Sequence, residues 1–133
     1  HVCYSRDYRL LYDRIPDLKI DGYNLEYSNR DLLERGLSDE KRPGFNDLKY
    51  FTEINESLQR RKFIGIGVTD VHIDYVEPVE LIEDRINYAL KIIKDPEIVR
   101  INPDCGLRTR SREIGEQKLR NMVAARNNVL KNL

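Results

Sequence analysis

Apolar residues along this chain recur at two different spacings, and the two spacings alternate. The continuous apolar run at 63–68 is typical of a strand that is buried on both faces. Apolar positions within 19–27 and 97–102 predict two further strands, and the short stretch 1–4 predicts the last piece of another. The pattern therefore predicts four strand segments that are separated by longer stretches of a different period.

Between these strands, apolar residues recur every three or four positions, which predicts amphipathic helices. The predicted helices cover 7–15, 46–58, 78–93 and 111–131. Pro16 and Pro96 are expected to end the first and the third of them, because proline cannot continue a helix. The apolar side of the last helix is expected to consist of Ile114, Leu119, Met122, Val123 and Leu130.

A strand followed by a helix, repeated four times, predicts βα units and a parallel sheet. Four such units amount to half of a closed eight-stranded barrel. The predicted fold is therefore α/β, the C-terminal half of a (β/α)8 barrel. Residues 1–133 are expected to form a single partial domain, because no shift in composition divides them. Since 1–4 supply only the end of a strand and the first residue is His1 rather than Met, we expect the missing N-terminal half of the barrel to lie upstream.

Charge and composition exclude several classes of protein. Lysine and arginine together number 23, and aspartate and glutamate also number 23, so the formal net charge is zero. This balance gives no electrostatic reason to expect a nucleic acid or an anionic membrane as a partner. The longest apolar runs are far shorter than the roughly 20 residues that a membrane helix needs. Two cysteines do not make a disulfide scaffold, so we expect a reduced, cytoplasmic protein.

Candidate metal ligands stand where the predicted strands end. His1 and Cys3 are two positions apart, so on a strand both side chains project to the same side. Glu26 ends the second predicted strand, and Cys105 comes just after the fourth. Because the carboxyl ends of parallel strands lie on one face, these four side chains could converge. Two thiolates, an imidazole and a carboxylate suit Zn²⁺, although a free cysteine is also common as a small buried apolar residue.

Four short motifs follow one another along the chain, and three of them contain these residues. They are HVCYS at 1–5, LEYS at 25–28, GVTDVH at 67–72 and NPDCGLRTR at 102–110. On these motifs the chain resembles the C-terminal catalytic barrel of the cobalamin-independent methionine synthase family, over essentially its whole length. It differs from the family pattern at Asn29, where many members have arginine, and in a longer and more charged segment at 35–61.

The resemblance implies roles for individual residues. It implies that His1, Cys3, Glu26 and Cys105 bind zinc and that His72 donates a proton to the departing nitrogen of the methyl donor. A proton donor is needed because the nitrogen is a poor leaving group unless it is protonated. An imidazole is suited to this role because it titrates near neutral pH.

Four neighbouring residues keep alternative readings. Asp70 could orient the ring of His72 as part of the catalytic set, or could only cap the end of the strand. Asp104 could hydrogen-bond near the metal ligands, or could be an ordinary turn residue after proline. Arg108 and Arg110 could meet an anionic substrate, or could form a solvated basic turn.

The resemblance also implies a reaction. It implies zinc-dependent transfer of a methyl group from 5-methyltetrahydrofolate, or from a methylated corrinoid, to the thiol of homocysteine or a related small thiol, which forms methionine. The chain alone is expected to be inactive, because contacts from the first half of the barrel are missing. Two alternatives stay open: an epoxide–coenzyme M thiol alkyltransferase of the same superfamily, and a non-catalytic half-barrel module that binds zinc.

Overall fold

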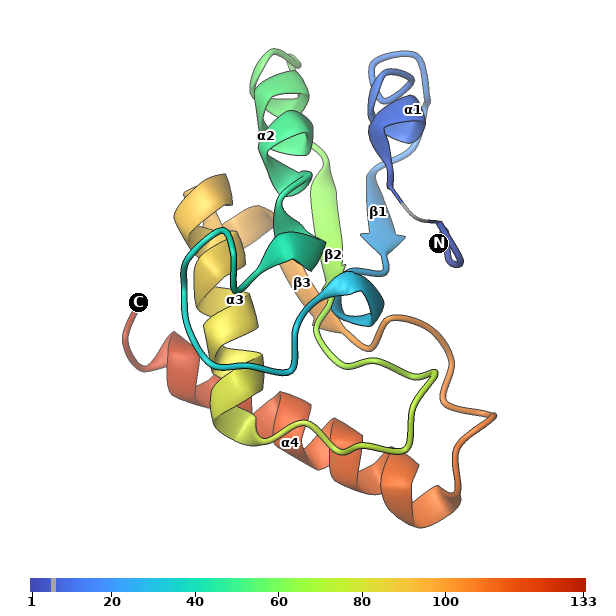
Figure 1. The fold of residues 1–133 in the computed structure, drawn as a ribbon. Helices are drawn as coiled ribbons and strands as arrows, with labels where there is room; N and C mark the ends of the chain where they lie inside the picture. Colours follow the sequence, from blue (N-terminus) through green and yellow to red (C-terminus); the bar gives the residue numbers. More distant parts are fainter. Residues whose placement is uncertain (6) are drawn as a thin grey trace.

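A parallel sheet lies at the centre of the molecule (Figure 1). The structure is a computed structural model and describes residues 1–5 and 7–133. In this part of the chain, the sheet contains β1 (Gly22–Leu25), β2 (Phe63–Gly67) and β3 (Val99–Asn102), in the order β1-β2-β3. The prediction of an α/β fold with a parallel sheet is confirmed.

The register places the carboxyl ends of the strands at one edge of the sheet. Ile64 of β2 pairs with Tyr23 of β1 on one side and with Val99 of β3 on the other. Val2 forms an isolated parallel bridge with Leu25, the last residue of β1. The beginning of the chain therefore continues the parallel arrangement past β1 by a single bridge, as expected for the end of a strand.

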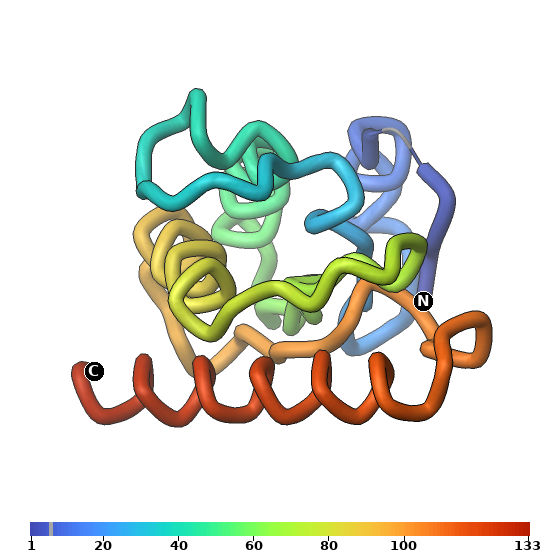
Figure 2. The backbone as a smooth tube through the Cα atoms, turned by 60° about the horizontal axis from the view of Figure 1, so that its bottom comes forward, coloured from blue at the N-terminus to red at the C-terminus, as the bar shows by residue number. Residues whose placement is uncertain are grey.

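Four α-helices lie in the described part of the chain: α1 (Arg9–Tyr12), α2 (Leu48–Glu56), α3 (Val79–Ile93) and α4 (Arg112–Leu130). They pack side by side in chain order, α1 against α2, α2 against α3 and α3 against α4. Figure 2 shows them as an arc around the strands. None of these helices is long and apolar enough to cross a membrane.

The two faces of β2 are covered differently. Three apolar side chains are fully buried on the helix side: Ile64, Ile66 and the adjacent Val68. The intervening residues are glycines, and polar side chains of the neighbouring strands lie across them. A Cβ atom at Gly65 would lie 1.9 Å from Oδ1 of Asn24 and 2.6 Å from Oδ1 of Asn102. The strand is buried on both faces, as predicted, but polar groups cover the glycine face.

Several predicted boundaries are wrong by two or more residues. α1 is shorter than the helix predicted at 7–15, and β1 is shorter than the strand predicted at 19–27. The strand predicted at 97–102 begins later, as β3, because a 3₁₀ turn at Pro96–Ile98 precedes it. The side chain of Asp95 caps this turn by accepting a backbone N–H within it.

The predicted apolar side of α4 is wrong for three of its five residues. Leu119, Val123 and Leu130 are exposed by 40%, 53% and 47%. The buried residues of α4 are Gly115, Lys118, Ala125 and Val129. Lys118 turns inward because a buried carboxylate, that of Glu77, binds its ammonium group at 2.8 Å. Val123 and Leu130 are exposed because they line an open apolar groove beside β3.

A chain of buried ion pairs joins the loops at the carboxyl ends of the strands to α3 and α4. Asp31 binds Arg42 at 2.7 Å and Arg85 of α3 at 3.0 Å. Arg85 in turn contacts Glu77 at 3.4 Å, and Glu77 binds Lys118 of α4. All five side chains are fully buried. Removing one partner would leave an uncompensated charge in the interior, which is strongly destabilising.

We therefore expect Lys118→Met to lower the free energy of unfolding by about 3–5 kcal/mol, the cost of leaving one member of a buried ion pair without its partner. Arg120→Met is the matched control, because Arg120 lies on the same helix and is exposed. It should change the stability by no more than about 0.5 kcal/mol. Urea titrations of both variants measure the difference, and equal unfolding midpoints would contradict the structural role of Lys118.

Candidate metal centre

Two thiols and an imidazole meet beside the carboxyl ends of the strands. The ligand atoms of His1, Cys3 and Cys105 all lie within 4.8 Å of one another. His1 and Cys3 flank Val2, which bridges to the end of β1, whereas Cys105 lies in the loop after β3. Figure 2 shows the beginning of the chain beside this loop. The structure therefore brings three of the predicted metal-binding side chains together.

The donor atoms and their spacing are compatible with zinc. Zinc bonds of about 2.0–2.3 Å put the ligand atoms of a tetrahedral site roughly 3.3–3.8 Å apart, so small side-chain movements suffice here. Partial burial raises the pKa of the Cys3 thiol, and the neighbouring thiol of Cys105 adds to the shift. A divalent cation between the two sulfur atoms would oppose this shift, because it favours the thiolates.

Glu26 lies beside this group of three but is not part of it. Its carboxylate is fully buried and accepts hydrogen bonds from the backbone N–H of Tyr4 at 2.6 Å and from the side chain of Asn29 at 3.0 Å. The other carboxylate oxygen, Oε1, lies 3.1 Å from Nε2 of His72. The predicted fourth ligand and the predicted proton donor are thus joined directly to each other.

The ring of His72 is placed by the contact with Glu26 and by packing against the ring of Tyr4, whose centroid lies 4.9 Å away. The backbone N–H of His72 donates to Asp70 Oδ1 at 2.8 Å. The N–H of Asp70 donates to the buried carboxylate of Glu77 at 2.6 Å. Asp70 therefore holds the backbone of the His72 segment, as in the capping alternative. The side chain of His72 is 28% exposed, so it can be reached from solvent.

Asp104 ties the ends of two strands together. Its buried carboxylate accepts the N–H groups of the three consecutive residues 27–29, at 2.9, 3.1 and 2.7 Å. Burial raises the pKa of this carboxyl group to about 6, against the effect of these hydrogen bonds. The contact fixes the loop that follows Glu26 relative to the loop that carries Cys105. Asp104 therefore holds two loops together and is not only a turn residue.

Gly67 makes this contact sterically possible. A Cβ atom at Gly67 would lie 2.0 Å from Oδ1 of Asp104 and 2.8 Å from its Cα atom. The second distance involves the backbone, so a rotation of the Asp104 side chain alone could not relieve the overlap. Glycine is required here for close approach rather than for an unusual backbone conformation.

Two residues beside the candidate ligands are not revealed by the sequence as parts of the site. The hydroxyl of Tyr8 accepts the backbone N–H of Glu26 at 2.9 Å, and burial raises the pKa of Tyr8 to about 12. Asn29 donates to the carboxylate of Glu26. The three-residue spacing between Asn29 and Glu26 is a weak local signal. Tyr8 leaves no such signal, because it is 18 residues away from Glu26 in the chain.

The two basic residues that follow Cys105 differ in exposure: Arg108 is solvated, whereas the side chain of Arg110 is only 17% exposed. Arg110 pairs with Asp74 in the loop between β2 and α3, and Arg108 is exposed. This arrangement joins two loops on the same side of the molecule. A role for either arginine in binding an anionic substrate stays a prediction.

The fold and the gathered cysteine and histidine side chains define an α/β protein with a candidate metal site at the carboxyl ends of its parallel strands. Residues 1–128 match the family described as cobalamin-independent synthase, catalytic domain. The chain belongs to this family, as its motifs predict.

Curated relatives are similar to this chain over its whole length. The chain is 89% identical to the methionine synthase of Thermoplasma acidophilum and 78% identical to that of Thermoplasma volcanium, over 133 residues in each case. It is 38% identical over 133 residues to the methionine synthase of Pyrococcus furiosus. The matched region is 39% of each Thermoplasma protein and 33% of the Pyrococcus protein. The chain thus spans about two fifths or less of the length of these relatives.

A solved structure shares the fold. It is described as a B12-independent methionine synthase from Shewanella sp. W3-18-1 in complex with selenomethionine, and it matches with a TM-score of 0.70 at 21% sequence identity. The match covers 94% of this chain and 31% of that one. At this identity the likeness concerns the fold alone, an α/β arrangement with a parallel sheet.

Gly67→Ala should lower the free energy of unfolding by about 1–3 kcal/mol, because the added methyl group overlaps the backbone of Asp104. Gly115→Ala in α4 is the control: its Cβ would meet only Leu107 Cβ at 3.8 Å, and alanine favours the helix by up to about 1 kcal/mol. Thermal unfolding should therefore move in opposite directions for the two variants. A Gly67→Ala protein as stable as the parent would contradict the close approach.

Proposed function

We propose that this chain supplies the metal-binding half of a zinc-dependent methyltransferase, which transfers a methyl group from 5-methyltetrahydrofolate or a methylated corrinoid to the thiol of homocysteine. The observation that carries the proposal is the convergence of His1, Cys3 and Cys105 at the carboxyl ends of the strands. Membership of the cobalamin-independent synthase family and the methionine synthase relatives support it.

The proposed zinc ligands are His1, Cys3, Cys105 and Glu26. The first three have neighbouring donor atoms, and the carboxylate of Glu26 is close enough to influence the thiol of Cys3 electrostatically. When bound, zinc would keep a substrate thiol in its thiolate form near neutral pH. Asn29 and the backbone N–H of Tyr4 would hold the Glu26 carboxylate in place through the oxygen that they share, Oε2.

His72 is the proposed proton donor to the departing nitrogen of the methyl donor. Its hydrogen bond to Glu26 orients the ring, and its partial exposure leaves it open to a substrate. Asp70 would act through the backbone, because it fixes the segment on which His72 is carried. Asp70 is therefore a positioning residue in this proposal, and His72 is the catalytic one.

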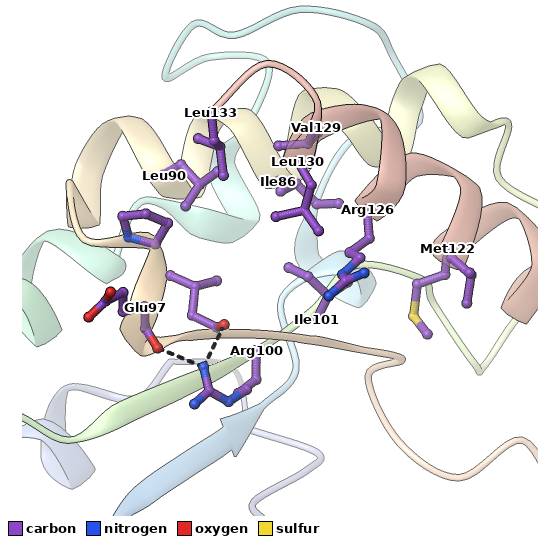
Figure 3. Close-up of a pocket in the computed structure, with 13 residues that line it drawn as sticks. Ile86, Leu90, Glu97, Arg100, Ile101, Met122, Arg126, Val129, Leu130 and Leu133 are labelled. Atoms are coloured by element: carbon purple, nitrogen blue, oxygen red, sulfur yellow. Dashed lines mark hydrogen bonds between the residues drawn. The ribbon is translucent and has the colours of Figure 1, made fainter.

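The proposed architecture is the C-terminal half of a (β/α)8 barrel, with residues 1–133 as one partial domain. In the described part of the chain, β3 pairs on one side only, with β2. An apolar groove of about 580 Å³ lies beside β3, between α3 and α4 (Figure 3). Its apolar lining includes Leu90, Ile101, Met122, Val123, Leu130 and Leu133. In the proposal, the first strand and helix of the barrel, part of the additional length of the relatives, cover this groove.

The reaction is tested with a full-length chimera, in which these 133 residues replace the matching segment of the Thermoplasma acidophilum methionine synthase. The chimera should bind about one zinc ion per chain and form methionine from homocysteine, because it contains a complete set of ligands. Cys105→Ala should lose both properties. Thr109→Ala, an exposed position in the same loop, should keep both.

The remaining outcomes distinguish the competing functions. Zinc bound without methyl transfer from either donor would indicate a non-catalytic module, and turnover of an epoxide with coenzyme M would indicate the related alkyltransferase. Unchanged zinc content in the Cys105→Ala chimera would contradict the proposed metal centre.

The half-barrel is tested by Val123→Glu. Val123 is 53% exposed in this structure, so in the 133-residue chain the change should alter the free energy of unfolding by no more than about 0.5 kcal/mol. In the full-length chimera the same carboxylate would be removed from water, and even beside Arg100 and Arg126 of the groove this should cost about 1–3 kcal/mol. Denaturant titrations of both proteins measure the contrast. Equal effects in the two proteins would contradict closure of the barrel over this groove.

A further inference from the structure

The hydroxyl of Tyr8 lies between two backbone segments that carry candidate metal ligands. It donates to the C=O of Val2 at 3.3 Å and accepts the N–H of Glu26 at 2.9 Å. Val2 stands between His1 and Cys3, and Glu26 follows the last residue of β1. One buried hydroxyl group, on a side chain that is 2% exposed, therefore connects both segments.

The hydroxyl reinforces the point at which the two segments are bridged. In a parallel pair, the residue that bridges donates to one side and accepts from the other. Val2 is bridged to Leu25, and its N–H donates to the C=O of Asn24 at 3.1 Å. The other two backbone groups of this bridge are the C=O of Val2 and the N–H of Glu26. The Tyr8 hydroxyl bonds to both of them.

The hydroxyl thereby links the two ligand-bearing segments at a defined separation. Beyond Val2, the backbone turns at Tyr4, which has a φ of 60°, and the Tyr4 N–H reaches the carboxylate of Glu26. Cys3 stands in the chain between Val2 and Tyr4, the two points of attachment. A change in the spacing between Val2 and Glu26 would therefore move Cys3 and His1 relative to the Glu26 carboxylate.

The ring of Tyr8 is held firmly enough to define this spacing. It packs against the rings of Tyr12 and Tyr27, with centroids 6.2 and 5.9 Å away. The guanidinium group of Arg30 lies over its face at 5.0 Å, and Arg30 is itself bound to Asp47 at 3.2 Å. The cation over the ring face and the edge-on contact with Tyr27 both favour one ring position.

We propose that Tyr8 is a positioning residue of the metal centre, whose hydroxyl sets the distance between the segment that carries His1 and Cys3 and the end of β1 that carries Glu26. This inference rests on the proposed zinc site and adds to it a residue outside the ligand set. Tyr8 would touch neither the metal nor the substrate. Its effect would be on the geometry and strength of metal binding.

The test is Tyr8→Phe in the full-length chimera. Without the hydroxyl, Glu26 N–H and Val2 C=O lose the group that bonds to both of them. This loss alters the arrangement of the ligands, and residues that orient metal ligands typically change metal affinity by about 10- to 100-fold. We expect the zinc dissociation constant, measured by competition with a chromophoric chelator, to rise by that factor. The spectrum of the Co²⁺-substituted protein should change as well.

Tyr12→Phe is the matched control. Tyr12 is as deeply buried as Tyr8, but its hydroxyl pairs with the side-chain hydroxyl of Tyr27 at 3.0 Å and not with the backbone groups of Val2 or Glu26. It should leave the zinc affinity and the Co²⁺ spectrum unchanged. Hydrogen exchange gives a readout without metal: the Glu26 amide should exchange faster in Tyr8→Phe than in Tyr12→Phe. Unfolding midpoints verify that both variants remain folded.

The outcomes separate this inference from the function on which it rests. A parent chimera that binds no zinc would overturn the metal centre and this inference with it. A parent that binds zinc, together with Tyr8→Phe and Tyr12→Phe variants of equal zinc affinity and equal Co²⁺ spectra, would overturn the role of Tyr8 alone. A loss of affinity confined to Tyr8→Phe would support it.

Discussion

The position of both strand-end loops depends on one carboxylate, that of Asp104. The backbone N–H groups of residues 27–29 follow the last residue of β1, so they have passed the end of its strand ladder, and they donate to Asp104 instead. A buried N–H group without an acceptor costs about 1–3 kcal/mol, so three such donors strongly favour this arrangement. The same contact requires glycine at position 67. The relative position of Glu26 and Cys105 therefore depends on the hydrogen bonds of the Asp104 carboxylate and on the lack of a side chain at Gly67.

Apolar packing and polar contacts stabilise different parts of this molecule. Apolar side chains of β2, α2 and α3 form the layer between sheet and helices. The loops that carry the chemistry are held mainly by buried charges and hydroxyl groups. Glu77 supports the His72 segment through Asp70, and is itself held by Arg85 and Lys118. Each buried charge in this network needs its partners, so a single substitution leaves another member unpaired. Such a substitution should therefore disturb the site as well as the stability.

The sequence is sufficient to predict the order of the elements, because their apolar spacing is a local property. It is also sufficient to place His1, Cys3 and Cys105 together, since the ends of parallel strands share one edge. It could not predict the buried side of α4, because Lys118 turns inward only in the presence of Glu77, 41 residues away in the chain. The position of Tyr8 between Val2 and Glu26 is also a tertiary contact. Its aromatic ring predicts burial, but nothing in the local pattern predicts where its hydroxyl lies.

The central claim is that side chains from three strand ends form one zinc centre with two sulfur ligands. Zinc K-edge X-ray absorption of the zinc-loaded full-length chimera tests it most directly. The claim predicts two sulfur atoms at about 2.3 Å and two nitrogen or oxygen atoms at about 2.0–2.2 Å in the first coordination shell. A shell of nitrogen and oxygen atoms only, or one with a single sulfur atom, would contradict it.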